Sequence, residues 1–210
     1  MILALLDGVR RHWLWAVNVT VAIFVGLPFL APVLLASGYP DAANGIYAAY
    51  QYVCHQWAFR SYFLFGPELT YGPDVLAGLV GQDAMYHTHG SPELGYTVAF
   101  CERDVAIYLA VLAAGLAYGR FRDRTPSLGI VAYSLLILPM AVDGFTQLFG
   151  WRESTVELRT LTGALFGVAS VWLIYPRVDA VFARDLGPAH DAAPASAQPA
   201  GAQSSGAQTA

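Results

Sequence analysis

Charge is scarce in this sequence, and lysine is missing altogether. Charged residues make up 12% of the 210 positions, all eleven basic residues are arginine, and 56% of residues are hydrophobic. A soluble domain usually carries about 25% charged residues, so the composition excludes an ordinary soluble protein and predicts a protein of the lipid bilayer. The net charge of −4 and the scattered arginines also exclude nucleic acid as a partner.

The sequence also lacks the motifs of the commonest enzyme classes. It has no phosphate-binding glycine loop, no Ser-His-Asp order and no zinc-protease helix. With only two cysteines and no C-x-x-C-H, it has no site for covalent haem. The sequence therefore identifies no cofactor, although a metal ion remains possible.

Long apolar segments are what the sequence does contain. About 20 helical residues span a bilayer, and four segments have this character: 13–35, 96–118, 128–149 and 155–175. We therefore predict an all-α polytopic membrane protein, a four-helix transmembrane bundle within one membrane domain over residues 13–185. Residues 1–12 form its N-terminus, and the Ala/Pro/Ser/Gln-rich tail at 186–210 is predicted to be disordered.

The arginines predict how the chain is oriented. Seven of them flank the four segments on one side: Arg10, Arg11, Arg120, Arg122, Arg124, Arg177 and Arg184. Arginine is enriched on the cytoplasmic side of membrane proteins, so we expect a multi-pass protein of the inner or plasma membrane with both termini in the cytoplasm. The other four, Arg60, Arg103, Arg152 and Arg159, then lie at the non-cytoplasmic face.

Residues 44–65 are apolar enough to suggest a fifth span. A fifth span would move the arginine-rich loop at 120–124 to the outside, against the charge rule. Residues Ile46, Tyr50 and Trp57 share a helical stripe, which favours an interfacial or re-entrant helix on the non-cytoplasmic side. Residues 66–95 follow as an external loop.

Polar residues interrupt the apolar segments at a single level. The second segment contains "CERD" at 101–104, and the third contains Asp143 and Gln147, one helical turn apart. Ser154 and Glu157 form a candidate capping box that starts the fourth helix. Charges inside a membrane are costly and point to function by default. We therefore predict one functional cluster near the non-cytoplasmic surface, composed of Cys54, His55, Gln56, Arg60, Cys101, Arg103, Asp104, Asp143, Gln147, Arg152, Glu157 and Arg159.

The two cysteines, Cys54 and Cys101, fall on the same, oxidising side in this topology. A disulfide between them is the simplest interpretation. A metal site is the alternative, with His55 and Asp143 as further ligands and with His87 and His89 of "YHTHG" as weaker candidates. Free or redox-active thiols are the third possibility.

Small residues suggest close helix packing. Gly115 and Gly119, and likewise Gly163 and Gly167, are four residues apart, a spacing that lets transmembrane helices approach closely. The contact can lie within the bundle, with another membrane protein or with a second copy of this chain.

Several functions fit these features. The first is binding of a small ligand or ion by the polar cluster, as part of a transport or assembly system. The second is a thiol- or metal-dependent membrane enzyme. The third is an accessory subunit, in which the cluster is a purely structural set of ion pairs or in which aromatic residues beside His55 and Arg60 bind a quinone or lipid headgroup.

Three sequence blocks resemble a known family. "CHQWAFRSYFLFG", "CERDVAIYLA" and "LPMAVDGFTQLFGWRESTVELRTLTGALFG" are similar to bacterial and archaeal integral membrane proteins grouped as a domain of unknown function with a Cys-His-Gln signature. The resemblance covers roughly residues 50–175. Many such relatives have a second cysteine at the position of Asp104, which favours a single Cys54–Cys101 bridge over a thiol-rich metal site here. The family has no agreed activity, so the resemblance identifies related proteins but implies no function.

Overall fold

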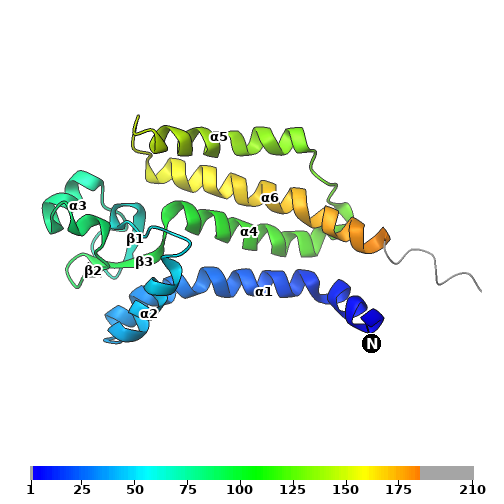
Figure 1. Cartoon of the computed structure of the whole chain (residues 1–210), viewed down its shortest axis with the longest axis horizontal. Helices are drawn as coiled ribbons and strands as arrows, with labels where there is room; N and C mark the ends of the chain where they lie inside the picture. Colours follow the sequence, from blue (N-terminus) through cyan, green and yellow to red (C-terminus); the bar gives the residue numbers. More distant parts are fainter. Residues whose placement is uncertain (1, 185–210) are drawn as a thin grey trace, which may run out of the picture.

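The computed structural model describes residues 2–184 and is dominated by four long helices (Figure 1). These are α1 (Ile2–Ala36), α4 (Glu102–Phe121), α5 (Ile130–Leu148) and α6 (Val156–Arg184). Each contains a stretch long and apolar enough to cross a membrane, because about 20 helical residues match the hydrocarbon thickness. The prediction of a helical polytopic membrane protein is confirmed. The predicted disordered tail lies outside the described residues.

The four helices lie side by side in the order α1, α4, α6, α5 (Figure 1). Two glycines set the spacing between α4 and α6. A Cβ atom on Gly163 would lie 2.9 Å from the carbonyl oxygen of Arg103, and one on Gly167 would lie 2.9 Å from the Cβ of Ala110. Only glycine fits at this distance, so the predicted close packing at these two positions occurs inside the protein.

The second predicted span starts later than expected. Residues Gly95–Cys101 form strand β3, and α4 begins at Glu102. The apolar stretch continues to Arg124 at the far end, so the helical length is kept although its start moves by six residues. The run "YTVAFC" at 96–101 contains β-branched and aromatic residues, which suit a buried strand.

The predicted interfacial helix over 44–65 is too long. Helix α2 covers Pro40–Tyr50, and after a loop and a short 3₁₀ turn (η1, Ala58–Arg60) strand β1 covers Ser61–Leu64. Strand β1 pairs antiparallel with β3, so that Ser61 lies opposite Cys101. The non-local backbone hydrogen bonds to β3 outweigh the helical stripe of this segment, because each strand would otherwise leave its polar backbone groups unpaired.

The predicted external loop contains structure of its own. Helix α3 (Pro73–Val80), the 3₁₀ turn η2 (Ala84–Tyr86) and strand β2 (Gly90–Ser91) lie within it, and the sheet order is β1-β3-β2. A small apolar core under α3 includes Phe59, Phe63 and Leu76. We call the end of the helices that carries this sheet the sheet end.

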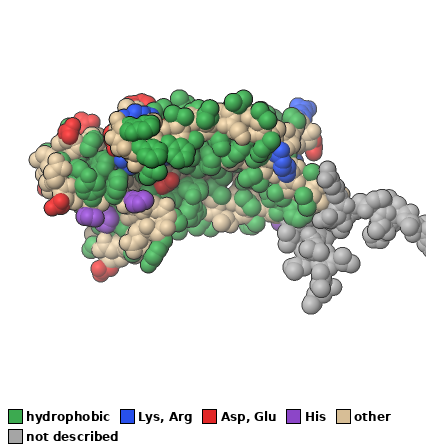
Figure 2. All heavy atoms as spheres, turned by 45° about the horizontal axis from the view of Figure 1, so that its top comes forward, with side chains coloured by type: hydrophobic (Ala, Val, Ile, Leu, Met, Phe, Trp, Pro, Cys, Tyr) green, Lys and Arg blue, Asp and Glu red, His purple; other side chains and the backbone are tan. Residues whose placement is uncertain are grey.

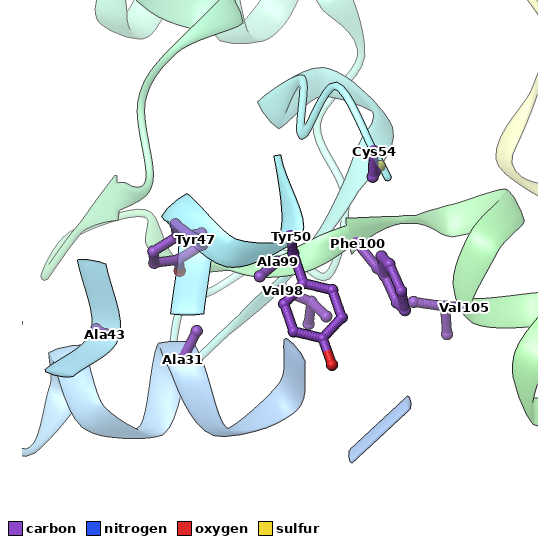
Figure 3. Close-up of a cluster of buried hydrophobic side chains, with 9 residues drawn as sticks. All are labelled: Ala31, Ala43, Tyr47, Tyr50, Cys54, Val98, Ala99, Phe100 and Val105. Carbon is purple, nitrogen blue, oxygen red and sulfur yellow. The ribbon is translucent and has the colours of Figure 1, made fainter. Parts of the chain in front are cut away.

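A larger core joins the sheet to the helices. Strand β3 contributes Val98, Ala99 and Phe100, which pack with α1 and α2 residues such as Ala31 and Tyr50 (Figure 3). Cys54 belongs to the same cluster and lies on the loop after α2. The core therefore holds this loop close to the start of α4.

Candidate functional site

Charged side chains gather at the two ends of the molecule, and apolar side chains cover the helices between them (Figure 2). At the sheet end the carboxylate of Asp143 is 1% exposed. It accepts hydrogen bonds from Arg103 on α4, from Arg152 at 2.5 Å and from the Ser154 hydroxyl at 2.9 Å. Helix α5 continues to Leu148, so Asp143 lies within the helix and not in a turn. Two arginines and a hydroxyl offset the cost of burying this charge.

A second set of ion pairs surrounds Arg159, which is 4% exposed. Its guanidinium donates to the fully buried Glu102 at 2.9 Å and also to Glu153. Glu153 receives two further hydrogen bonds from Arg60, both at 2.8 Å. Gln147 joins the two sets, because it accepts from Arg103 at 2.9 Å and donates to Glu153 at 3.2 Å. The residues of α4, α5, α6 and the β1 region are thereby connected at one level.

Glu102 and Glu153 are the members of this network that the sequence prediction missed. Both lie in the first turn of a helix or just before one, where the helix dipole favours a carboxylate. That position explains them as capping charges, so nothing in the local sequence marked them as partners of Arg159. The one signal was that four arginines are expected at this level, which calls for more carboxylate partners than Asp143 alone can supply.

Glu157 is the one predicted cluster residue that stays outside. It is exposed, and it takes part in none of the ion pairs formed among residues 2–184. The predicted capping box also does not form: the Thr155 hydroxyl accepts from the amide of Leu158 at 3.3 Å, while Ser154 donates to Asp143. Thr155, directly before the first residue of α6, therefore takes the capping role, and the Ser154 hydroxyl is oriented toward the buried carboxylate.

A cavity of about 500 Å³ lies beside the ion pairs. We call it the cysteine cavity. It lies between the loop after α2, the start of α4 and the end of α5, and its lining consists of Val53, Cys54, His55, Gln56, Trp57, Arg60, Cys101, Arg103, Asp104, Gly144, Gln147 and Leu148. Eight of the twelve predicted cluster residues therefore line one cavity.

The two cysteines meet in this cavity as free thiols. The predicted disulfide is absent from the structure, which instead has the backbone amide of Cys101 donating to Sγ of Cys54 at 3.2 Å. The thiol of Cys101 donates to Oδ2 of Asp104, also at 3.2 Å. The ligand atoms of the three residues all lie within 4.8 Å of one another. The neighbouring side chain of Cys54, together with burial, raises the pKa of the Cys101 thiol well above its ordinary value.

The composition of this group differs from the predicted metal site. Asp143 points to its arginines, and Asp104 takes its place beside the thiols. His55 is exposed and faces the ring of Trp57, with 5.5 Å between ring centroids. Within residues 2–184, the only group of three close metal-ligand residues is Cys54, Cys101 and Asp104.

His55 and Gln56 also line a second, smaller cavity of about 380 Å³ that contains His87 and His89. Gln56 has a positive φ of 55° and donates to the carbonyl of Tyr47 at 2.9 Å, so it fixes the loop between the two cavities. The imidazole of His89 stacks on Tyr47 at 3.6 Å, and burial lowers its pKa. The two predicted loop histidines thus belong to a separate cavity from the thiols.

The opposite end of the helices contains a second polar cluster, which the sequence prediction missed. Asp179 on α6 accepts hydrogen bonds from the Trp13 indole at 3.1 Å, from Tyr118 and from Arg122. These bonds tie α1, α4 and α6 together. The sequence placed the end of the fourth span at residue 175, whereas α6 runs on to Arg184, which brings Asp179 onto the helix.

Comparison with known proteins shows which family the chain belongs to. Residues 93–173 match the model of a predicted membrane protein family, DUF2085. An uncharacterised protein of Methanocaldococcus jannaschii is 32% identical over 135 residues, which is 62% of this chain and 67% of that protein. The chain belongs to this family. A second uncharacterised protein, from Methanothermobacter thermautotrophicus, is 33% identical over 88 residues, covering 40% of this chain and 79% of its own length. No solved structure matches the chain.

The family match and the site overlap in part. Residues 93–173 include Cys101, Arg103, Asp143 and Arg159, whereas Cys54 and its loop precede the matched segment. The family carries no described activity, so any function must be argued from the geometry of the site.

Proposed function

We propose that this membrane protein binds a small polar ligand or ion in the cysteine cavity, from the non-cytoplasmic side. The observation that carries the proposal is the cavity of about 500 Å³ lined by side chains from three separate segments. Ligand sites are typically concave and combine apolar lining with a few convergent polar groups. Trp57, Val53 and Leu148 supply the apolar part here, beside the thiols, amides and arginines.

The ion pairs behind the cavity support a binding role over a purely structural one. They fix Arg60 and Arg103 by hydrogen bonds to Glu153 and Asp143, so the cavity is formed before a ligand arrives. A preformed site loses less conformational entropy on binding. The residues that resemble the Cys-His-Gln signature, such as Cys54, Gln56 and Arg103, line this cavity, and a shared binding role would explain that resemblance.

The orientation is part of the same proposal. Arg120 lies in the last turn of α4, and Arg122 and Arg124 lie in the connection to α5; arginine-rich segments of this kind face the cytoplasm. The sheet end, with the cavity, then faces outward, and both termini lie in the cytoplasm of a cell whose inner or plasma membrane holds the protein.

A cavity-filling variant tests the proposal. Gly144 lines the cavity, and a Cβ atom added to it would have Nη1 of Arg103 as its nearest neighbour, 3.9 Å away. Leucine at this position should occupy the space without breaking α5. Gly26→Leu on α1, where a Cβ meets nothing within 4 Å, is the matched control.

The measurement is the melting temperature of the purified chain in detergent, with a panel of inorganic anions, including phosphate, and of divalent cations. We expect at least one probe to raise the melting temperature of the wild type and of Gly26→Leu but not of Gly144→Leu, because only a ligand of the folded state stabilises it. A panel that stabilises all three proteins equally, or none, contradicts the proposal.

A further inference from the structure

One carboxylate at the cysteine cavity has no cationic partner among residues 2–184. Glu102, Asp143 and Glu153 all bind arginines, and these contacts engage all four arginines of the sheet end. Asp104 takes part in none of the ion pairs formed within residues 2–184. Its one side-chain hydrogen bond there is from the thiol of Cys101. Within the described part of the chain, no arginine therefore neutralises the carboxylate at this corner of the cavity.

The same corner has the right ligand atoms for a metal. Two ligands of a tetrahedral zinc ion lie about 3.5–3.8 Å apart, given bond lengths of about 2.3 Å to sulfur and 2.0–2.2 Å to oxygen. Sγ of Cys101 and Oδ2 of Asp104 are 3.2 Å apart, and Sγ of Cys54 lies within 4.8 Å of both ligand atoms. Side-chain shifts of about 1 Å would bring all three onto one ion.

We propose that Cys54, Cys101 and Asp104 bind one soft divalent metal ion of the Zn²⁺ or Cd²⁺ class, with a remaining coordination position open to the cysteine cavity. This inference rests on the proposed function, since it names the ion that the cavity takes. Thiolate ligands select soft or borderline metals, whereas Mg²⁺ and Ca²⁺ prefer oxygen ligands alone. On binding, each thiol releases its proton to solvent and forms a sulfur–metal bond.

The immediate surroundings of the thiols favour a metal over a redox disulfide. A carboxylate oxygen lies 3.2 Å from the Cys101 sulfur, and the Cys54 sulfur lies within 4.8 Å of both atoms. A metal ion would use all three ligand atoms, whereas a disulfide would use only the two sulfurs. The backbone amide that donates to Sγ of Cys54 at 3.2 Å is the kind of outer hydrogen bond that supports a metal-bound thiolate.

Cadmium titration of the reduced, purified full chain tests this site. Two thiolates bound to Cd²⁺ give a sulfur-to-metal charge-transfer band in the ultraviolet, so we expect one Cd²⁺ per wild-type chain with a band for two sulfurs. Cys54→Ser and Cys101→Ser should each halve the band and weaken binding by at least about 100-fold, because losing a ligand costs no less than losing an outer partner. Asp104→Asn should keep the band and weaken binding by at least about tenfold.

Asp74→Asn is the control, because Asp74 is an exposed aspartate at the same end of the molecule. It should bind Cd²⁺ as the wild type does. Helical circular dichroism and gel filtration establish that each variant is folded, and Asp104→Asn keeps the size of the side chain. A reduced wild-type chain with no charge-transfer band, or variants that all keep the full band and affinity, would overturn the proposal.

The outcomes separate this inference from the proposed function. If the wild type binds no Cd²⁺ while another probe stabilises it in a manner that Gly144→Leu abolishes, the metal site is wrong and cavity binding stands. In the alternative outcome, Cd²⁺ gives the full band in both the wild type and Gly144→Leu, while every probe changes the melting temperatures of the two proteins equally. The metal site is then confirmed, and the proposed binding of a ligand in the rest of the cavity is wrong.

Discussion

Asp143 lies inside an apolar helix and is 1% exposed, yet it contacts two arginines and a serine. Placing an isolated charge at this depth of a membrane costs on the order of 2.5–3.5 kcal/mol of free energy. This cost falls when oppositely charged partners are held in place around it. The reverse also holds: removing the carboxylate leaves two guanidinium groups facing each other without compensation.

We therefore expect Asp143→Asn to be strongly destabilising. Removal of one partner from a buried ion pair costs about 3–5 kcal/mol, and the partial exposure of both arginines places the loss at the lower end, near 3 kcal/mol. Denaturation of the purified protein in mixed detergent micelles measures it. Asp123→Asn, at an exposed aspartate of the α4–α5 connection, should change stability little, and an equal loss in both variants would contradict the role of Asp143.

Tyr47 gives a prediction about pH. It is buried on α2, its hydroxyl donates to the carbonyl of Thr97 at 2.5 Å, and burial raises its pKa to about 12. Between pH 10 and 12 the folded state keeps this proton while the unfolded state loses it. The free energy of unfolding should therefore fall as pH rises through this window, by up to about 1.4 kcal/mol per unit.

Denaturation at pH 9, 10 and 11 measures this slope. Tyr47→Phe should make it shallower, and at neutral pH it should cost about 1 kcal/mol for the lost hydrogen bond. Tyr52→Phe, at an exposed position, is the control and should keep the wild-type slope. An unchanged slope in Tyr47→Phe would refute the assignment.

At the scale of elements, the contact between α4 and α6 positions the ion pairs. Glu102 starts α4 and Arg159 lies in the first turn of α6, so their 2.9 Å hydrogen bond depends on how closely the two helices pack. The glycines of α6 set that distance. A change in helix spacing should therefore reach the cavity as well as the packing.

Gly167→Leu tests this dependence. A Cβ at Gly167 would lie 2.5 Å from the carbonyl oxygen of Ile107, so the helices must separate, at a cost of about 1–3 kcal/mol or more. We expect a lower melting temperature in detergent than for the wild type, while Gly26→Leu, at an open position of α1, should stay close to it. Similar melting temperatures for both variants would show that the α4–α6 contact tolerates expansion.

At the scale of the whole molecule, the two ends of the helices differ in kind. The sheet end carries the thiols, the cysteine cavity and three histidines (His55, His87 and His89), whereas the opposite end carries the Asp179 cluster and the arginine-rich connection. This asymmetry makes the proposed orientation testable without knowledge of any ligand.

Reporter insertions measure the orientation. Alkaline phosphatase, which is active only outside the cytoplasm, should be active when inserted after Gly81 and inactive when inserted after Thr125. A fluorescent protein that folds only in the cytoplasm should give the converse pattern. The physical reason is the retention of arginine-rich loops on the cytoplasmic side. Activity of the phosphatase at Thr125 would reverse the orientation and place the cysteine cavity in the cytoplasm.

The site could be predicted only in part. Spacing along each helix placed Cys101, Asp104, Asp143 and Arg159 at one level, because helical rise is a local property that the sequence determines. This spacing does not predict which charged side chains form ion pairs with each other. Whether Arg159 binds Glu102 or Glu157, and whether Asp143 joins the thiols or the arginines, depends on how neighbouring helices rotate against each other.

Hydropathy and segment length were enough to predict a bilayer protein with four spanning helices, because both are sums over neighbouring residues. The sheet and the position of the two thiols follow from contacts between distant parts of the chain. Pairing of Ser61 with Cys101 joins residues forty positions apart, and such non-local hydrogen bonds leave no periodic trace in either strand's sequence. That pairing turned an expected helix into a strand, and it brought the two sulfurs and Asp104 into one cavity.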